Sequence, residues 1–109
     1  MSVGMARKKD LCVRKKRLLS EFESQGIPYR AAKIDREAVL YRKLRNYDIE
    51  ISGASHRRPF SVYVWALQNE RHPVYTVENH DIQSKDIPAA AAVINALAEK
   101  YEEAPAHEF

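Results

Sequence analysis

The residues of this chain whose type and spacing best fit a chemical role are its cations. The densest run starts at residues 7–9 and continues with Arg14, Lys15, Lys16 and Arg17. Guanidinium and ammonium groups at this density can neutralise several phosphates and release their counterions, which gives strong, salt-sensitive affinity for nucleic acid. A solvated helix face that keeps the protein soluble would carry the same kind of run. Both interpretations stay open at this point.

The charges are also distributed unevenly along the chain. Residues 1–58 hold fifteen Lys or Arg against seven Asp or Glu, a balance of +8, whereas residues 59–109 hold three against eight, a balance of −5. The overall charge of +3 therefore conceals a basic front half. A segregated positive surface attracts nucleic acid, or the acidic surface of a protein partner.

Histidine and cysteine are too sparse to predict a metal site. His72, His80 and Asp81 come closest, with His107 farther along the chain, but their spacing matches no common zinc pattern and Cys12 is the only cysteine. A lone cysteine also excludes an internal disulfide and fits a reducing compartment, so we expect a cytoplasmic protein. The sequence predicts neither a metal nor a cofactor.

Motifs of catalysis are missing as well. The three glycines, Gly4, Gly26 and Gly53, do not form a loop that cradles phosphate, and no Ser-His-Asp or Cys-His arrangement stands out. Asp48 and Glu50 alternate with apolar residues, which predicts the solvated side of an edge strand, where carboxylates discourage edge association. The sequence therefore predicts a binding protein and not an enzyme.

Two helices are expected to position the front cations. The first begins near Asp10, ends before Gly26, and has an apolar stripe formed by Leu11, Leu18, Leu19 and Phe22. A second helix is predicted over residues 35–45, where Asp35 is a suitable N-cap and Leu40 lies one turn before Leu44. The connector 27–34 has room for a short strand.

Alternating apolar and polar residues then predict three strands. They cover residues 47–51, residues 60–67, where both faces are apolar, and residues 74–77, which are rich in strand formers. The short connections imply an antiparallel meander. A last helix is expected to start near Asp86, whose carboxylate is a good N-cap.

These elements predict an α+β fold in the order α-α-β-β-β-α, with a three-stranded antiparallel sheet and the helices packed on one face. A chain of 109 residues fits one domain, expected over residues 10–102, with a basic flexible N-terminus at 1–9 and a flexible tail at 103–109. No apolar run approaches the ~20 residues of a membrane span, and the charged first residues do not resemble a secretory signal. We therefore expect no membrane association.

The middle of the chain carries a recognisable pattern. Tyr47 followed by Gly53, His56, Phe60, Val62 and Val64 gives the spacing Y…GxxHxxxFxVxV. This spacing resembles the first hairpin of the double-stranded RNA-binding domain. The segment Ser84-Lys85 with the alanines at 89–91 and Ala96-Leu97 resembles the last helix of that family. The resemblance covers roughly half of the chain. The helix–three strands–helix order of the family matches the order of elements predicted above, apart from one additional helix.

The resemblance implies a function and a set of contact residues. In that family the hairpin loop enters an RNA minor groove, so Gly53 and His56 would approach 2′-hydroxyl groups, with Arg57 and Arg58 strengthening the contact. Lys85, at the start of the last helix, would contact phosphates across the intervening major groove. The predicted function is a non-catalytic nucleic-acid-binding module that favours duplex RNA and recognises its shape and phosphates.

One residue departs from the family pattern and supports a second hypothesis. The family presents several lysines at the start of the last helix, whereas here Lys85 is followed by Asp86, which repels phosphate. The alternative is a protein-interaction module, either a homodimer or a small inhibitor or adaptor of the kind that mobile elements encode. It would use the basic front half and an apolar face of the sheet.

That apolar face is predicted from four residues. They are Tyr63, Trp65, Leu67 and Tyr75. If exposed, they could stack on unpaired bases or form the centre of a protein interface. If the first helix packs over them, they would instead complete a second small core.

Overall fold

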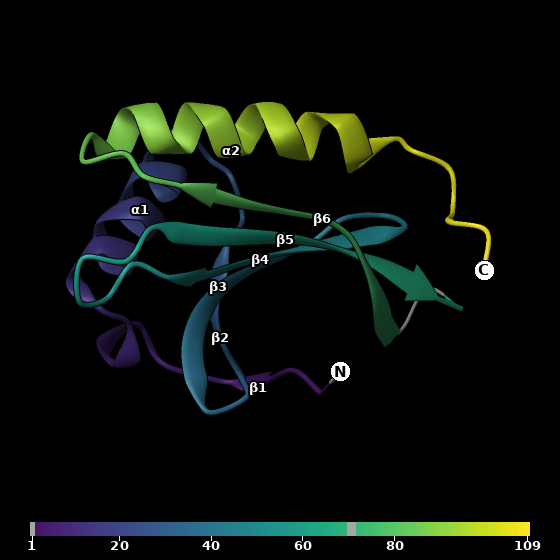
Figure 1. Cartoon of the computed structure of the whole chain (residues 1–109), viewed down its shortest axis with the longest axis horizontal. Coiled ribbons are helices and arrows are strands. Elements are labelled where there is room, and N and C mark those ends of the chain that lie inside the picture. Colours follow the sequence, from purple (N-terminus) through teal and green to yellow (C-terminus); the bar gives the residue numbers. More distant parts are fainter. Residues whose placement is uncertain (1, 70–71) are drawn as a thin grey trace.

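The computed structural model describes residues 2–69 and 72–109 and contains one six-stranded antiparallel sheet and two α-helices (Figure 1). Along the chain the elements are β1 (Gly4–Met5), a short 3-10 helix η1 (Lys8–Asp10), α1 (Val13–Ser24), β2 (Arg30–Ile34), β3 (Glu37–Lys43), β4 (Tyr47–Gly53), β5 (Phe60–Gln68), β6 (His72–Ile82) and α2 (Ile87–Glu102). The strands lie in the sheet in their chain order, so each described strand pairs with the next one.

The predicted three-stranded sheet is therefore wrong, although the α+β class is correct. The expected helix over residues 35–45 is strand β3, which pairs with β2 on one side and with β4 on the other. The connector 27–34 contains β2. Together with the short β1, these strands double the size of the sheet.

The burial of β3 explains why its sequence was misread as a helix. Leu40 faces the helices and belongs to the main core, whereas Val39 and Tyr41 face the opposite side and form a smaller cluster. A strand that is apolar on both faces loses its alternation, so the spacing of Leu40 and Leu44 imitated a helical turn. The β2–β3 turn is formed by Asp35 and Arg36, both with positive φ, as a two-residue hairpin turn requires.

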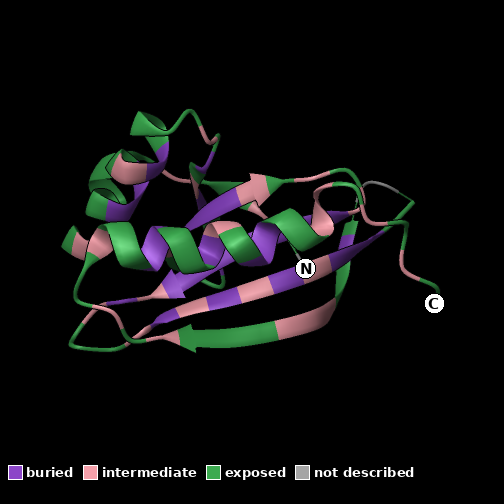
Figure 2. Cartoon of the chain, turned by 90° about the horizontal axis from the view of Figure 1, so that it is seen from above, coloured by how far each residue is buried: buried purple, intermediate pink, exposed green. Residues whose placement is uncertain are grey.

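Both α-helices lie where their sequence signals place them. In α2 the carboxylate of Asp86 accepts a hydrogen bond from the Ala89 N–H at 3.1 Å, and Pro88 occupies the first turn, where no N–H donor is needed. The buried apolar residues of α1 and α2 belong to one cluster, so both helices pack on the same face of the sheet. Figure 2 shows α2 crossing that face with its outer side exposed.

The main core lies between the two helices and strands β3–β5. Its fully buried side chains include Leu18, Phe22, Leu40, Ile49, Ile51, Phe60, Val62, Val64 and Ile94. Burial of this apolar surface is the main driving force for the fold. None of the helices in the described part of the chain is long and apolar enough to cross a membrane.

The opposite face of the sheet carries buried polar groups. Figure 1 shows β3 curving away from β4–β6, and the β2–β3 hairpin partly encloses this face. Asp48 is fully buried and Glu50 is 6% exposed, so the prediction that they form the solvated side of an edge strand is wrong. The reason is that β4 is a central strand, flanked by β3 and β5.

The buried Asp48 has partners of its own. Its carboxylate accepts a hydrogen bond from the Tyr41 hydroxyl at 2.5 Å, and Lys43 lies 3.8 Å away. Burial raises the pKa of Asp48, against the lowering effects of the Tyr41 hydrogen bond and of the Lys43 and Arg30 charges.

The two ends of the chain contact the sheet. Residues 4–5 pair with β2 as β1. After α2 the chain contacts the start of β4, where the Tyr47 hydroxyl donates to the Pro105 carbonyl oxygen at 3.0 Å and the preceding Asn46 side chain donates to that of Ala104 at 2.9 Å.

Candidate nucleic-acid interface

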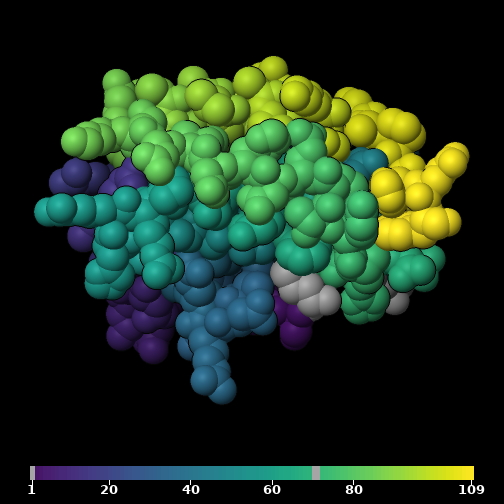
Figure 3. Space-filling model, in the orientation of Figure 1, coloured from purple at the N-terminus to yellow at the C-terminus, as the bar shows by residue number. Residues whose placement is uncertain are grey.

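A hollow of about 470 Å³ opens at one end of the sheet. Three segments that are distant in sequence meet there: the start of α1, the β4–β5 turn and the β6–α2 connection, at the left of Figure 1. Figure 3 shows these segments gathered on the surface in purple, teal and green. The described residues that line the hollow are Arg14, Arg57, Arg58, Pro59, Gln83, Ser84 and Lys85. Four of these residues are cations and none of them is a carboxylate.

Arg14 holds the three segments together. Its Nη1 donates to the Arg58 carbonyl oxygen at 2.9 Å, and its Nη2 donates to the Ser84 carbonyl oxygen at 2.6 Å. The guanidinium also lies over the Phe60 ring, 4.4 Å from its centroid, in cation–π geometry. The planar fork of arginine reaches the two carbonyl oxygens with two separate nitrogens, whereas a lysine would have to reach both from a single nitrogen atom. Arg14 therefore positions both loops and leaves its positive charge at the base of the hollow.

The β4–β5 turn has an unusual backbone. Gly53 has φ +75°, and a Cβ at this position would lie 2.6 Å from the Pro59 carbonyl oxygen, so only glycine fits. Ala54, His56 and Arg57 also have positive φ, at 65°, 52° and 66°, a region that side chains rarely occupy. Such strain persists only where the surroundings hold the backbone in place, and it is found most often at functional sites.

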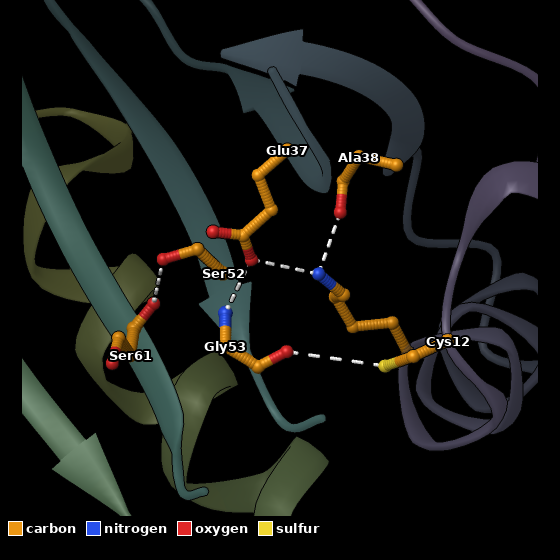
Figure 4. A network of polar contacts seen from close by, with 7 residues as sticks. Cys12, Glu37, Ala38, Ser52, Gly53 and Ser61 are labelled. Atoms are coloured by element: carbon orange, nitrogen blue, oxygen red, sulfur yellow. Dashed lines mark hydrogen bonds and ion pairs between the residues drawn. The ribbon is translucent and has the colours of Figure 1, made fainter. Parts of the chain in front are cut away.

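A partly buried ion pair, with Lys15 buried and Glu37 exposed, supports the turn (Figure 4). The Glu37 carboxylate accepts hydrogen bonds from the Gly53 N–H at 2.7 Å and from the Lys15 ammonium at 2.9 Å. Lys15 also donates to the Ala38 carbonyl oxygen at 2.5 Å and is only 3% exposed. The Cys12 thiol approaches the Gly53 carbonyl oxygen at 3.9 Å. Lys15, expected to contact phosphate, is therefore a structural cation that anchors α1 to β3 and β4.

The carboxylate of Asp86 has the N-cap role that the sequence predicted. It is used at the helix N-terminus, where it accepts the Ala89 N–H, and it is not among the described residues that line the hollow. Lys85, the preceding residue, does line the hollow. The Asp86 carboxylate therefore competes less with a phosphate in the hollow than its place in the sequence implied.

The predicted contact residues are only partly brought together. Arg14, Arg57, Arg58 and Lys85 line one hollow, and Gly53 and His56 belong to the turn on its rim, where His56 is exposed. Lys16 and Arg17 are exposed on α1, and Arg17 lies one turn after Arg14. The predicted site did not include Pro59, Gln83 and Ser84, which also line the hollow. Of these, Ser84 belonged to the segment that resembles the last helix of the family, whereas Gln83 carried no signal beyond its position.

The four residues of the predicted apolar face do not form one surface. Tyr63 and Trp65 are half-buried on the face away from the helices, and Leu67 is buried. Tyr75 pairs with Ala66 of the main core, so it points to the helix side, where its ring stacks on His107 with centroids 5.3 Å apart. Helix α1 covers neither Tyr63 nor Trp65, because it packs on the opposite face.

Comparisons of the chain with protein-family models, with curated proteins and with solved structures find no match. The likeness to the double-stranded RNA-binding domain therefore rests on the spacing of the motif residues alone, and the fold that it implied differs from the six-stranded sheet described above.

Proposed function

We propose that this chain is a non-catalytic module that binds the phosphate backbone of nucleic acid, preferring duplex RNA, through the hollow at the start of α1. The observation that carries the proposal is the convergence of Arg14, Arg57, Arg58 and Lys85, from three separate segments, around one open surface. Phosphate contacts of this kind provide most of the sequence-independent affinity for nucleic acid.

The cations around the hollow are available to a ligand. Within the described residues, Arg57, Arg58 and Lys85 form no ion pair, and the side chains of all three are exposed. Arg14 is already held by two carbonyl groups, so binding costs it little further side-chain entropy. A phosphate in the hollow would gain charge-assisted hydrogen bonds without displacing an internal carboxylate.

The preference for RNA rests on the shape of the β4–β5 turn. The turn projects at the edge of the molecule and exposes His56 and Arg57 (teal, Figure 3). A projecting turn fits the wide, shallow minor groove of A-form RNA, where 2′-hydroxyls are accessible, better than the narrower minor groove of B-form DNA. Lys85, across the hollow, would then face the phosphates of the neighbouring strand.

Fluorescence anisotropy with a labelled RNA duplex tests the proposal. The double variant Arg57→Ala/Lys85→Ala should bind at least about tenfold more weakly than the wild type, since two phosphate contacts are lost. The matched control, Lys33→Ala/Lys100→Ala, removes the same charge from exposed positions on β2 and at the end of α2 and should bind almost as the wild type does.

Two results would count against the proposal. Equal weakening by both double variants would show that net charge, and not the hollow, determines affinity. Equal affinity for a DNA duplex of the same length would remove the preference for RNA.

A further inference from the structure

A second hollow, of about 390 Å³, lies on the sheet face away from the helices. The tip of the β2–β3 hairpin forms one side of it and strands β4 and β5 form the other. Its lining consists chiefly of Ile34, Asp35, Glu37, Glu50, Tyr63 and Trp65. The function proposed above makes no use of this hollow.

The lining of this hollow has an excess of negative charge. Its described residues include three carboxylates and no cation. The charge of Glu37 is compensated by Lys15 of α1, whose ammonium nitrogen lies 2.9 Å from the Glu37 carboxylate. In the part of the chain that the structure describes, neither Asp35 nor Glu50 has an ion-pair partner. Two carboxylates therefore face the hollow without a counter-ion.

Glu50 is the stronger indication of a ligand site, because it is only 6% exposed whereas Asp35 is exposed to solvent. One of its oxygens accepts the Trp65 indole N–H at 3.0 Å, which fixes the side chain at the wall of the hollow. Burial raises the pKa of Glu50, and the charges of Glu37 and Asp35 raise it further, against the hydrogen bond from Trp65. An ionised carboxylate that is buried without a cation is destabilising unless a ligand supplies the missing charge.

The other wall of the hollow is aromatic. Tyr63 and Trp65 lie two residues apart on β5, both half-buried, with ring centroids 6.4 Å apart and planes inclined at 32°. Aromatic faces attract cations through the ring quadrupole and also accept apolar surface. Ile34 adds an aliphatic patch. This combination suits a cation that carries hydrocarbon.

We propose that the second hollow binds an organic cation, an alkyl ammonium or alkyl guanidinium group, with its charge beside Glu50 and its alkyl stem against Tyr63 and Trp65. The same chemistry is offered by a small amine and by a lysine or arginine side chain of a peptide. The basic hollow has the opposite charge and is lined by other residues, so the two sites take different ligands.

Trp65 provides a direct readout because it is the only tryptophan of the protein. Titration with n-butylguanidinium should change its emission and the NMR signal of its indole N–H along one saturable curve. N-butylurea, a neutral molecule of nearly the same shape, should leave both unchanged. An arginine-containing peptide with blocked ends, compared with its citrulline counterpart, distinguishes a side chain from a free amine as the source of the group.

Substitutions locate the binding. Glu50→Gln keeps the acceptor for the indole and removes the charge, so it should weaken binding of n-butylguanidinium by more than about tenfold, which corresponds to about 1.4 kcal/mol. Asp35→Asn, at an exposed turn position whose positive φ asparagine tolerates, should weaken it less. Glu99→Gln, on the exposed side of α2, is the control and should have no effect.

Three results would overturn the proposal. The first is an equal response to n-butylguanidinium and N-butylurea, and the second is an unchanged affinity for n-butylguanidinium in both Glu50→Gln and Asp35→Asn. The third is stronger binding of Mg²⁺ than of the organic cation at the same position. If Glu50→Gln fails to fold, Asp35→Asn and the neutral ligand still decide the matter. Neither experiment involves nucleic acid, so failure here is distinguishable from failure of RNA binding.

Discussion

Gly53 is the residue on which the geometry of the β4–β5 turn depends. It combines a positive φ with a close approach to the Pro59 carbonyl oxygen, and its N–H is held by Glu37. Gly26, after α1, has nearly the same φ of +72° but open space where a Cβ would lie. The two glycines therefore separate the effect of φ from the effect of a steric clash.

We expect Gly53→Ala to lower the free energy of unfolding by about 3 kcal/mol, because the backbone must move in addition to bearing the unfavourable φ. Gly26→Ala should lower it by about 1 kcal/mol, the effect of φ alone. Urea denaturation followed by circular dichroism measures both. Similar losses for the two variants would contradict the close approach at Gly53.

Glu50 links stability to pH in an unusual direction for a carboxylate. Its pKa is raised on folding above its ordinary value of 4.5, so the folded state binds the proton more tightly than the unfolded state does. The contribution of Glu50 to stability is therefore complete below pH 4.5 and is lost as the pH rises toward the raised pKa.

Removing this charge should stabilise the protein at neutral pH. Glu50→Gln is expected to raise the free energy of unfolding at pH 7 by on the order of 1 kcal/mol, with the gain disappearing below the ordinary carboxyl pKa. Urea titrations of wild type and variant at several pH values measure the difference. A gain that is independent of pH, or a loss at pH 7, would contradict the assignment of Glu50 as a buried carboxylate without a counter-ion.

At the scale of elements, the cationic end of the molecule is held together by side chains from α1. Arg14 joins α1 to the β4–β5 turn and to the β6–α2 connection, and Lys15 joins it to β3 and β4 through Glu37. Adjacent residues of one helix thus fix two sides of the same turn. The strained backbone near His56 is held by these contacts.

The guanidinium of Arg14 should not be replaceable by an ammonium group. Arg14→Lys is expected to lower the free energy of unfolding by about 1–2 kcal/mol, since one carbonyl oxygen loses its donor. Arg17→Lys, one exposed turn further along, should change it by less than about 0.5 kcal/mol. Chemical denaturation measures both; equal small effects would show that Arg14 does not hold the loops.

At the scale of the whole molecule, the two hollows separate charge. The basic hollow lies at the end where α1 starts and its described lining holds no carboxylate, whereas the hollow on the far sheet face is acidic. A small protein with this separation of charge attracts a polyanion to its basic end, and the electrostatic attraction weakens as the salt concentration rises.

The number of phosphates contacted can be read from that salt dependence. If Arg57, Arg58 and Lys85 each neutralise one phosphate, the logarithm of the association constant should fall with the logarithm of salt concentration with a slope of about −3. The variant Arg57→Ala/Lys85→Ala should reduce the slope to about −1. Anisotropy titrations over a range of potassium chloride concentrations measure both slopes, and identical slopes would exclude these residues from the contact.

The sequence by itself determined the features that depend on local chemistry. The apolar stripe of α1, the N-cap at Asp86, the alternation in β4 and the glycine turn at Gly53 were all visible in it. Each depends on residues close together in the chain, whose backbone preferences and side-chain periods act over a few residues.

Only the tertiary structure decided what depends on contacts between distant segments. Residues 37–43 form a strand because β2 and β4 pair with them, and that pairing buries both of their faces and removes the alternation by which a strand is recognised. The same packing buries Asp48, Glu50 and Lys15, which their local sequence marked as solvated. It also brings Arg14 beside residues 57–58 and Lys85. The burial of a side chain and its distance from other charges depend on its neighbours in space, and the periodicity of the sequence does not encode these neighbours.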